Sequence, residues 1–143
     1  MDLTISQSAL AEIHRHACEG HPHEVVGILA GRRAGRLVTR AVALVNERAD
    51  SPRNRYSVGP LVLFRAEQAL ADEGLEVVGY YHSHPDHPAQ YSTFDRDHAL
   101  PNMVYLITSV AGGAPPVVAD TRVWWLREDR EAMDELPITV TEV

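Results

Sequence analysis

The run His82-Ser83-His84-Pro85 restricts the folds open to this chain more than any other segment. Side chains two residues apart in an extended backbone point to the same side, and the proline keeps His84 out of helical conformation. The apolar residues 75–81 before the run predict a strand, so the two imidazoles converge where that strand ends. An isolated pair of this kind is also typical of an ordinary exposed strand end, and both interpretations stay open at this point.

A second motif, Ser92-Thr93-Phe94-Asp95, follows the histidine pair. Its S-x-x-D spacing resembles a capping box and predicts a short helix that begins at Ser92 and stops before Pro101. A carboxylate held by such a cap suits a metal ligand as well as it suits the helix. His82, His84 and Asp95 together supply the three protein ligands of a catalytic zinc site, which leaves the fourth position to water.

A water activated by zinc needs a base, and Glu24 is the preferred candidate. It opens the apolar stretch 25–30, where an acid is less routine than in a helix. Glu12 and Glu19 lie within a predicted helix and are expected in solvent. Cys18 is a weaker candidate, as a nucleophile, because the sequence places no histidine beside it and its helical position suggests packing.

The remaining histidines are given no role in the site. Two of them flank the motif and are left unassigned, because extra histidines near a zinc site are more often surface groups than ligands: His87 and His98. Four others are expected in solvent: His14, His16, His21 and His23.

The rest of the chain alternates between helical and extended patterns. Ser6 caps a helix that ends at Gly20, and Pro60 begins a second helix that ends at Gly74. Strands are predicted over residues 25–30, 37–45, 75–81, 103–110, 117–126 and 138–143, with a turn at 31–36 joining the first two as a hairpin. Residues 46–54 are polar and are expected to form a surface loop. The pattern predicts one α/β domain over residues 1–143, a layered sheet with helices packed on it.

Charge and cysteine content exclude several classes of function. The chain has 13 Lys and Arg against 20 Asp and Glu, a formal net charge of −7, and its cations are scattered apart from a small group at residues 32–40. Nucleic acid is therefore not expected as a partner. Cys18 alone cannot form an internal disulfide, which favours a reducing, cytoplasmic location. The sequence shows no export signal, and no apolar run approaches the roughly 18 residues that span a membrane, so no membrane partner is expected.

Taken together, the motifs resemble those of a known family. Glu24, the His82-Ser83-His84-Pro85 run and the Ser92 to Asp95 motif match the E…H-S-H-P-x6-S-x-x-D signature of the JAMM (MPN+) metalloproteases. Residues 24–31 are similar to the E-x-x-G-x-L-x-G segment that carries the acid of that family. The resemblance covers nearly the whole chain. It implies a single α/β domain with the JAB1/MPN fold, a cytidine-deaminase-like mixed and curved sheet packed against helices.

The resemblance also implies a role for each of five residues. His82, His84 and Asp95 would bind one catalytic Zn²⁺, Glu24 would act as general base and then as proton donor, and Ser92 would hydrogen-bond the oxyanion of the tetrahedral intermediate. These roles follow ordinary zinc chemistry, in which the metal activates its water and polarises the scissile carbonyl. The reaction would be hydrolysis of an amide or isopeptide bond without an acyl-enzyme.

The chain is similar to the compact prokaryotic members of the family, because residues 96–102 leave little room for the insertions of eukaryotic deubiquitinating members. Those compact relatives are associated with ubiquitin-like sulfur-carrier proteins that end in Gly-Gly. The resemblance therefore implies a metallopeptidase that cleaves the amide bond after such a Gly-Gly, with the substrate's extended tail laid beside a strand. It leaves a homodimer open.

Two other classes of function place different requirements on the sequence. A non-catalytic MPN scaffold for protein binding keeps the fold without the metal, and the intact set of acid and ligands argues against it. A zinc nucleoside deaminase needs a P-C-x-x-C pattern, which a chain with one cysteine cannot contain.

Overall fold

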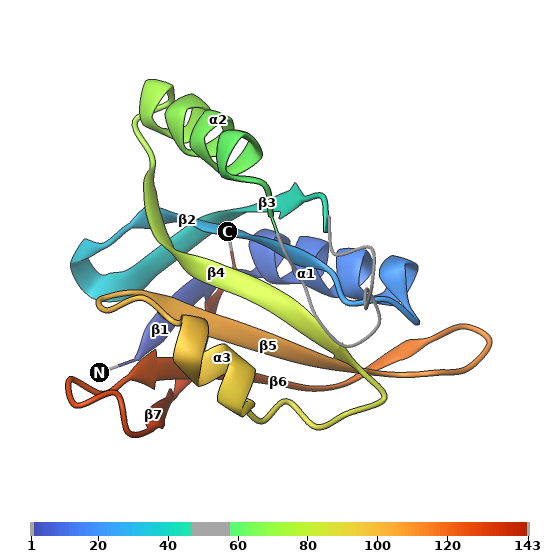
Figure 1. The fold of residues 1–143 in the computed structure, drawn as a ribbon. Helices are drawn as coiled ribbons and strands as arrows, with labels where there is room; N and C mark the ends of the chain where they lie inside the picture. Colours follow the sequence, from blue (N-terminus) through green and yellow to red (C-terminus); the bar gives the residue numbers. More distant parts are fainter. Residues whose placement is uncertain (1, 47–57, 143) are drawn as a thin grey trace.

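A curled sheet carries three helices in the part of the chain that the structure, a computed structural model, describes: residues 2–46 and 58–142. The predicted loop 46–54 falls outside these residues except for Asn46. The elements follow one another as β1 (Leu3–Ser6), α1 (Gln7–Gly20), β2 (Val26–Arg32), the 3-10 turn η1 (Ala34–Arg36), β3 (Leu37–Leu44), α2 (Pro60–Asp72), β4 (Glu76–Pro85), α3 (Thr93–His98), β5 (Val104–Ala111), β6 (Val117–Leu126), β7 (Met133–Leu136) and β8 (Ile138–Thr141) (Figure 1).

The order of the strands explains why the sheet curls. Among the described residues the order is β7-β6-β5-β4-β2-β3-β1-β8, so β7 and β8 lie at opposite ends. Only Pro137 separates these two strands in the chain, and its carbonyl accepts a hydrogen bond of 2.9 Å from the amide of Leu3. A proline has no amide hydrogen and cannot continue a ladder, so the segment changes partner there from β6 to β1. The two ends of the sheet must therefore approach one another.

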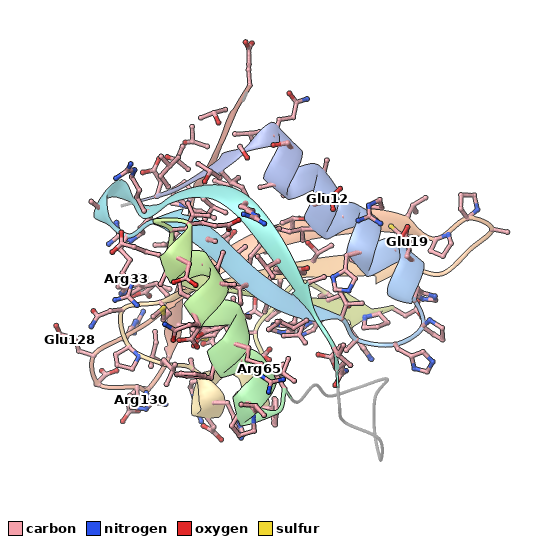
Figure 2. The ribbon with its side chains drawn as sticks, turned by 90° about the horizontal axis from the view of Figure 1, so that it is seen from above. Glu12, Glu19, Arg33, Arg65, Glu128 and Arg130 are labelled. Atoms are coloured by element: carbon pink, nitrogen blue, oxygen red, sulfur yellow. The ribbon has the colours of Figure 1, made fainter. Side chains whose placement is uncertain are left out.

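Both faces of the sheet are covered, and the sequence reflects this. Helix α1 contacts β1, β3, β4, β5 and β6 and buries Ala9, Ile13 and Ala17 against them. Helix α2 lies on the other side of β2 and β3 and buries Leu70 over Val26, Ile28 and Ala30 (Figure 2). Strands β2 and β5 are accordingly buried along almost their whole length. This explains why they appear in the sequence as continuous apolar runs instead of alternating ones.

Most predicted elements are confirmed. Ser6 caps α1 by accepting the amide of Ala9 at 3.2 Å, and α1 ends at Gly20. Pro60 lies in the first turn of α2. Strands β2 and β3 form the predicted antiparallel hairpin, and the other predicted strands are found at β4, β5, β6 and β8. None of the described helices is long and apolar enough to span a membrane.

Three details of the sequence-based prediction were wrong. Strand β4 does not stop at Tyr81 but continues to Pro85, because pairing with β5 extends through both histidines. Strands β1 and β7 were not predicted, since each has four residues and neither consists wholly of β-branched residues, as the equally short β8 does. Gly31 was expected in the hairpin turn but lies in β2, where a side chain would meet the carbonyl oxygen of Leu37 at 2.1 Å.

A glycine beside the histidine pair has a packing role. A Cβ atom at Gly27 would lie 2.1 Å from the ring of Tyr81 on the neighbouring strand. That ring is buried, and its hydroxyl lies 2.7 Å from Nδ1 of His16, so it has little freedom to move aside. The glycine that follows Glu24 by three residues therefore allows β2 and β4 to carry the acid and the histidines side by side.

Candidate metal centre

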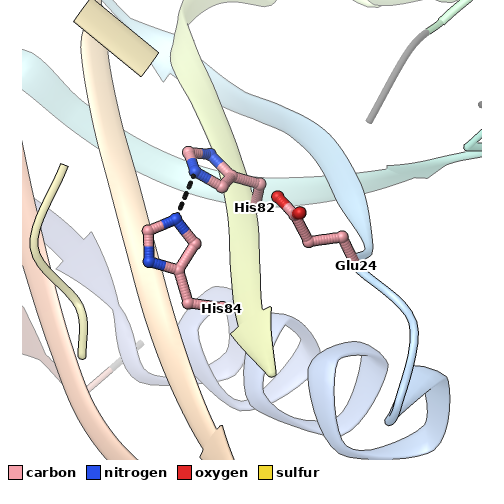
Figure 3. Close-up of side chains that lie close together, drawn as sticks. All are labelled: Glu24, His82 and His84. Atoms are coloured by element: carbon pink, nitrogen blue, oxygen red, sulfur yellow. Dashed lines mark hydrogen bonds between the residues drawn. The ribbon is translucent and has the colours of Figure 1, made fainter. Parts of the chain in front are cut away.

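The two histidines of the motif lie on β4 and face one another. Their Nε2 atoms are 3.3 Å apart, and a dashed line joins the two rings in Figure 3. His82 is buried and pairs in register with Ile107 of β5, while His84 pairs with Ser109. The strand therefore holds both rings on one side, as the spacing of two residues requires.

Asp95 is brought to this pair by α3. Its carboxylate oxygens lie 3.1 Å from Nε2 of His82 and 3.4 Å from Nε2 of His84. The predicted capping box is present: the amide of Asp95 donates to the Ser92 hydroxyl at 3.1 Å, and the amide of Ser92 donates to Asp95 Oδ2 at 2.8 Å. The cap that starts the helix thus also fixes the direction of the carboxylate.

The spacing of these three groups fits a small divalent cation. Four ligands arranged as a tetrahedron at about 2.0–2.1 Å from zinc lie about 3.3 Å from one another. The observed separations of 3.3, 3.1 and 3.4 Å match that edge length. Two imidazoles and a carboxylate are also the donor types that zinc prefers. The residues present can therefore hold such a metal.

Protonation in the metal-free protein follows from the same contacts. Burial alone would lower the pKa of His84, but hydrogen bonds to Asp95 and to the Pro88 carbonyl outweigh it and leave that pKa raised. Burial alone would raise the pKa of Asp95, but the hydrogen bonds from both histidines hold it well below its usual range. A proton on His84 thus occupies part of the space that a metal would take.

A backbone carbonyl orients His84. Its Nδ1 lies 2.8 Å from the carbonyl oxygen of Pro88. Since a carbonyl can only accept, Nδ1 must carry the hydrogen, and in the neutral ring Nε2 then presents a lone pair toward His82 and Asp95. This arrangement is common for histidines that bind metals.

The connection between β4 and α3 is fastened along its length. The side chain of Trp124 donates to the Ala89 carbonyl at 3.0 Å, and Tyr91 packs edge-on against the same indole. Ser109 donates a short hydrogen bond to the carbonyl of His87. Asp86 accepts the amide of Gly112 at 2.7 Å. These contacts anchor the segment to β5, β6 and the turn between them, so Ser92 and Asp95 are held at a fixed distance from the histidines.

Glu24 is the acid that reaches the centre. It is 6% exposed, and its carboxylate extends toward His82 and His84, so that one ligand atom of each of the three lies within 4.8 Å of the others (Figure 3). Glu12 and Glu19 instead lie along the outer side of α1 (Figure 2), where their side chains are 57% and 61% exposed and pair with Arg15. Position therefore distinguishes Glu24 from the other two acids.

Ser92 lines a cleft that opens beside these groups. The cleft has a volume of about 850 Å³ and includes Glu24, His84 and Asp95 in its wall. The Ser92 hydroxyl accepts the Asp95 amide and keeps its own hydrogen for a group in the cleft. The sequence did not identify further wall residues, since nothing in its pattern shows which loops meet: Gln90, Tyr91, Phe94 and Asp97, with the unassigned His87 and His98.

Other histidines and the cysteine have structural contacts. Three histidines expected in solvent are instead bound, to partners at least 65 positions away that periodicity cannot reveal. The pairs are His14 with Thr121 at 2.9 Å, His16 with Tyr81 at 2.7 Å and His21 with Asp86 at 3.0 Å. His23 is exposed, as expected. Cys18 packs against the core, which agrees with the packing role predicted for it.

Comparison with known proteins gives the relationship directly. Residues 6–127 match the family described as prokaryotic homologs of the JAB domain. The chain belongs to this JAB-domain family. The resemblance to JAMM proteins and the mixed α/β fold inferred from the sequence are therefore confirmed.

Two relatives match most of this chain, and the name of the second describes a protease that cleaves protein conjugates. The desampylase of Haloferax volcanii is 38% identical over 115 residues, which cover 77% of this chain and 82% of the relative. A probable TtuB-protein conjugate cleaving protease of Thermus thermophilus is 37% identical over 110 residues, which cover 77% of this chain and 72% of the relative.

Solved structures support the fold. A protein from Desulfitobacterium hafniense aligns with a TM-score of 0.79 at 28% identity, covering 99% of this chain and 94% of that one. A JAB1/MPN-domain protein from Archaeoglobus fulgidus aligns with a TM-score of 0.60 at 18% identity, covering 98% of this chain and all (100%) of that one. The second likeness is one of fold alone.

The JAB-domain centre is expected to bind one divalent ion through the histidine pair. Cobalt(II) added to the metal-free protein should bind with the absorption spectrum of a tetrahedral site, because the donor spacing matches a tetrahedron. Loss of a residue that only hydrogen-bonds a metal ligand weakens metal binding roughly 10- to 100-fold. His84→Ala removes a ligand itself and should weaken cobalt binding by more than that. His98→Ala, at the cleft wall, should bind cobalt as the native chain does. Equal affinity in all three proteins would contradict this assignment.

Metal affinity is expected to depend on pH. The pKa of His84 is raised above its ordinary value of 6.5 in the metal-free protein, so below the raised value a proton must leave before the metal binds. The apparent affinity for cobalt should fall about tenfold per pH unit below that pKa and level off above it. Asp95 does not contribute to the pH dependence of cobalt affinity near neutral pH, because its lowered pKa keeps it ionised there. Titration against a competing chelator measures this, and a level affinity from about pH 8 to pH 6 would count against it.

Proposed function

We propose that this chain is a zinc-dependent isopeptidase that hydrolyses the amide bond after the C-terminal Gly-Gly of a ubiquitin-like or sulfur-carrier protein. The observation that carries the proposal is the position of the Glu24 carboxylate. It is buried and extends toward His82 and His84, whose nitrogens have the spacing of metal ligands. The names of the Haloferax and Thermus relatives support the substrate class. A protein-binding scaffold without catalysis would have no use for a buried acid in that position.

His82, His84 and Asp95 would hold the zinc ion. When bound, zinc lowers the pKa of a coordinated water to about 7 and polarises a carbonyl group. The protein's own contribution is to keep the three ligands apart at the required distance and to orient His84 through the Pro88 carbonyl. The capping box does the same for Asp95.

Glu24 and Ser92 would handle the proton and the developing charge. The Glu24 carboxylate accepts a proton from the attacking water and later gives it to the amine of the leaving group. The Ser92 hydroxyl, whose acceptor side is already engaged by the Asp95 amide, donates its hydrogen to the scissile carbonyl oxygen as that oxygen gains negative charge. No covalent intermediate with the protein is needed.

The substrate tail would lie in the cleft. We expected it beside a strand, and this placement stays a prediction. At His82 both sides of β4 are already paired, with β2 and with β5. There the tail would cross the cleft wall formed by Glu24, the β4–α3 connection and α3. Two glycines have no side chains, so they would let the backbone approach the buried histidines closely.

Glu24→Gln separates catalysis from metal binding. The substitution keeps size and polarity but removes the base, so the catalytic constant should fall about 10²- to 10⁴-fold. Zinc content, measured by atomic emission, should stay at one equivalent. The assay is cleavage of a TtuB-protein conjugate, the substrate class in the name of the Thermus relative. Native activity retained by the variant would refute the role of Glu24, and a native chain that takes up no zinc would refute the enzyme itself.

Ser92→Ala should reveal two separate losses. Loss of the cap should lower the free energy of unfolding by about 1 kcal/mol, and loss of the oxyanion donor should lower the catalytic constant about 10²- to 10³-fold. Ser6→Ala is the matched control, because Ser6 caps α1 in the same way. It should lose similar stability in urea unfolding and keep its activity. Equal activity of Ser92→Ala and Ser6→Ala would show that Ser92 acts only as a helix cap.

A further inference from the structure

The peptide unit that follows Glu24 is held in an unusual way. Glu24 and Val25 precede β2, which begins at Val26. Both polar groups of the peptide between them are bound by side chains from distant parts of the chain. The amide of Val25 donates to the Ser83 hydroxyl at 2.9 Å, and the Glu24 carbonyl accepts from the Asn46 side-chain amide at 2.9 Å.

Ser83 is the more deeply placed of the two. It is 0% exposed and lies between the two histidines, so its side chain points to the opposite face of β4. Its own amide also donates to the Val25 carbonyl at 3.1 Å. A buried hydroxyl is unfavourable unless it is hydrogen-bonded, and here its partner is the residue next to Glu24.

Asn46 reaches the same peptide unit from the opposite side. It follows β3, which ends at Leu44, and is half-buried. Because its amide binds the Glu24 carbonyl while Ser83 binds the Val25 amide, the plane of the peptide is fixed at both edges. That plane sets the direction in which the Glu24 side chain leaves the backbone.

We propose that Ser83 and Asn46 are positioning residues that aim the Glu24 carboxylate at the metal centre. The inference rests on the proposed function, in which Glu24 is the base. A glutamate carboxylate lies about 4 Å from its Cα atom, so a tilt of the peptide by about 15° moves it by about 1 Å. A misplacement of about 1 Å can cost about 10²-fold in rate. Ser83 thus links the metal-binding strand to the residue that acts on the water.

The test compares Ser83→Ala with a control that loses a hydroxyl of equal burial. Thr108 is the register partner of Ser83 on β5, is also 0% exposed, and its hydroxyl bonds Thr121 instead of Val25. In zinc-loaded protein, Ser83→Ala should lower kcat roughly 10- to 100-fold with unchanged KM and zinc content. Thr108→Val should keep kcat within about twofold. Ser83→Thr, which restores the hydroxyl, should recover most of the rate.

The combination with Glu24→Gln separates positioning from general damage. In that background Ser83→Ala should cause no further loss, because the group that it aims is already absent. The inference would be overturned if Ser83→Ala lowered kcat by the same factor in the native chain and in Glu24→Gln. Equal kcat values in Ser83→Ala and Thr108→Val would overturn it as well. Should Ser83→Ala fail to fold, Asn46→Ala at its half-buried position carries the same expectation and the same refutation.

A second measurement does not depend on cleavage. Hydrogen exchange of the Val25 amide, followed by NMR, should speed up at least tenfold or so in Ser83→Ala and stay unchanged in Thr108→Val. An unchanged exchange rate of the Val25 amide in Ser83→Ala would refute the role of Ser83 in holding this peptide unit. If the native zinc-loaded chain fails to cleave the TtuB-protein conjugate, the proposed function is refuted. Ser83 and Asn46 then have no catalytic residue to position. Native cleavage with no effect of Ser83→Ala would refute the inference alone.

Discussion

The structure is organised around a contact at 3.1–3.4 Å between the Nε2 atoms of His82 and His84 and the two carboxylate oxygens of Asp95. Two imidazole nitrogens and a carboxylate at that distance repel one another unless a proton or a cation lies among them, and the raised pKa of His84 reflects the first case. Keeping such groups together requires rigid support. The strand, the capped helix and the anchored connection between them supply it.

The sheet provides that support because its centre is buried on both faces. Strand β4 lies between β2 and β5, with α1 on one side and α2 and α3 on the other (Figure 1). Its end cannot shift without disturbing packed side chains, since protein interiors are close-packed. Curling of the sheet, which the single residue Pro137 between β7 and β8 imposes, brings α1 into contact with both halves. The site thus lies at the end of a strand whose two faces are both packed.

Sequence patterns predicted most of this fold and named the residues that meet at the candidate site. The helix caps at Ser6 and Ser92 act over three residues, so they are visible locally. The strands β1 and β7 were not predicted because they are short and contain fewer β-branched residues than the equally short β8. The side-chain contacts of His14, His16 and His21 were not predicted because their partners are far away in the chain. For the same reason, nothing in the sequence connects Asn46 or Ser83 with Glu24.

The sequence by itself determined which donors share a strand and which carboxylate a helix cap holds, because these relations depend on backbone geometry over two or three residues. Tertiary structure alone decided the distances at which the acid and the histidines meet. The local pattern favoured Glu24 over Glu12 and Glu19. Sheet pairing places Glu24 beside β4, and α1 turns the other two acids toward solvent (Figure 2). Distances between groups about 60 residues apart depend on the packing of the whole sheet, which no local pattern encodes.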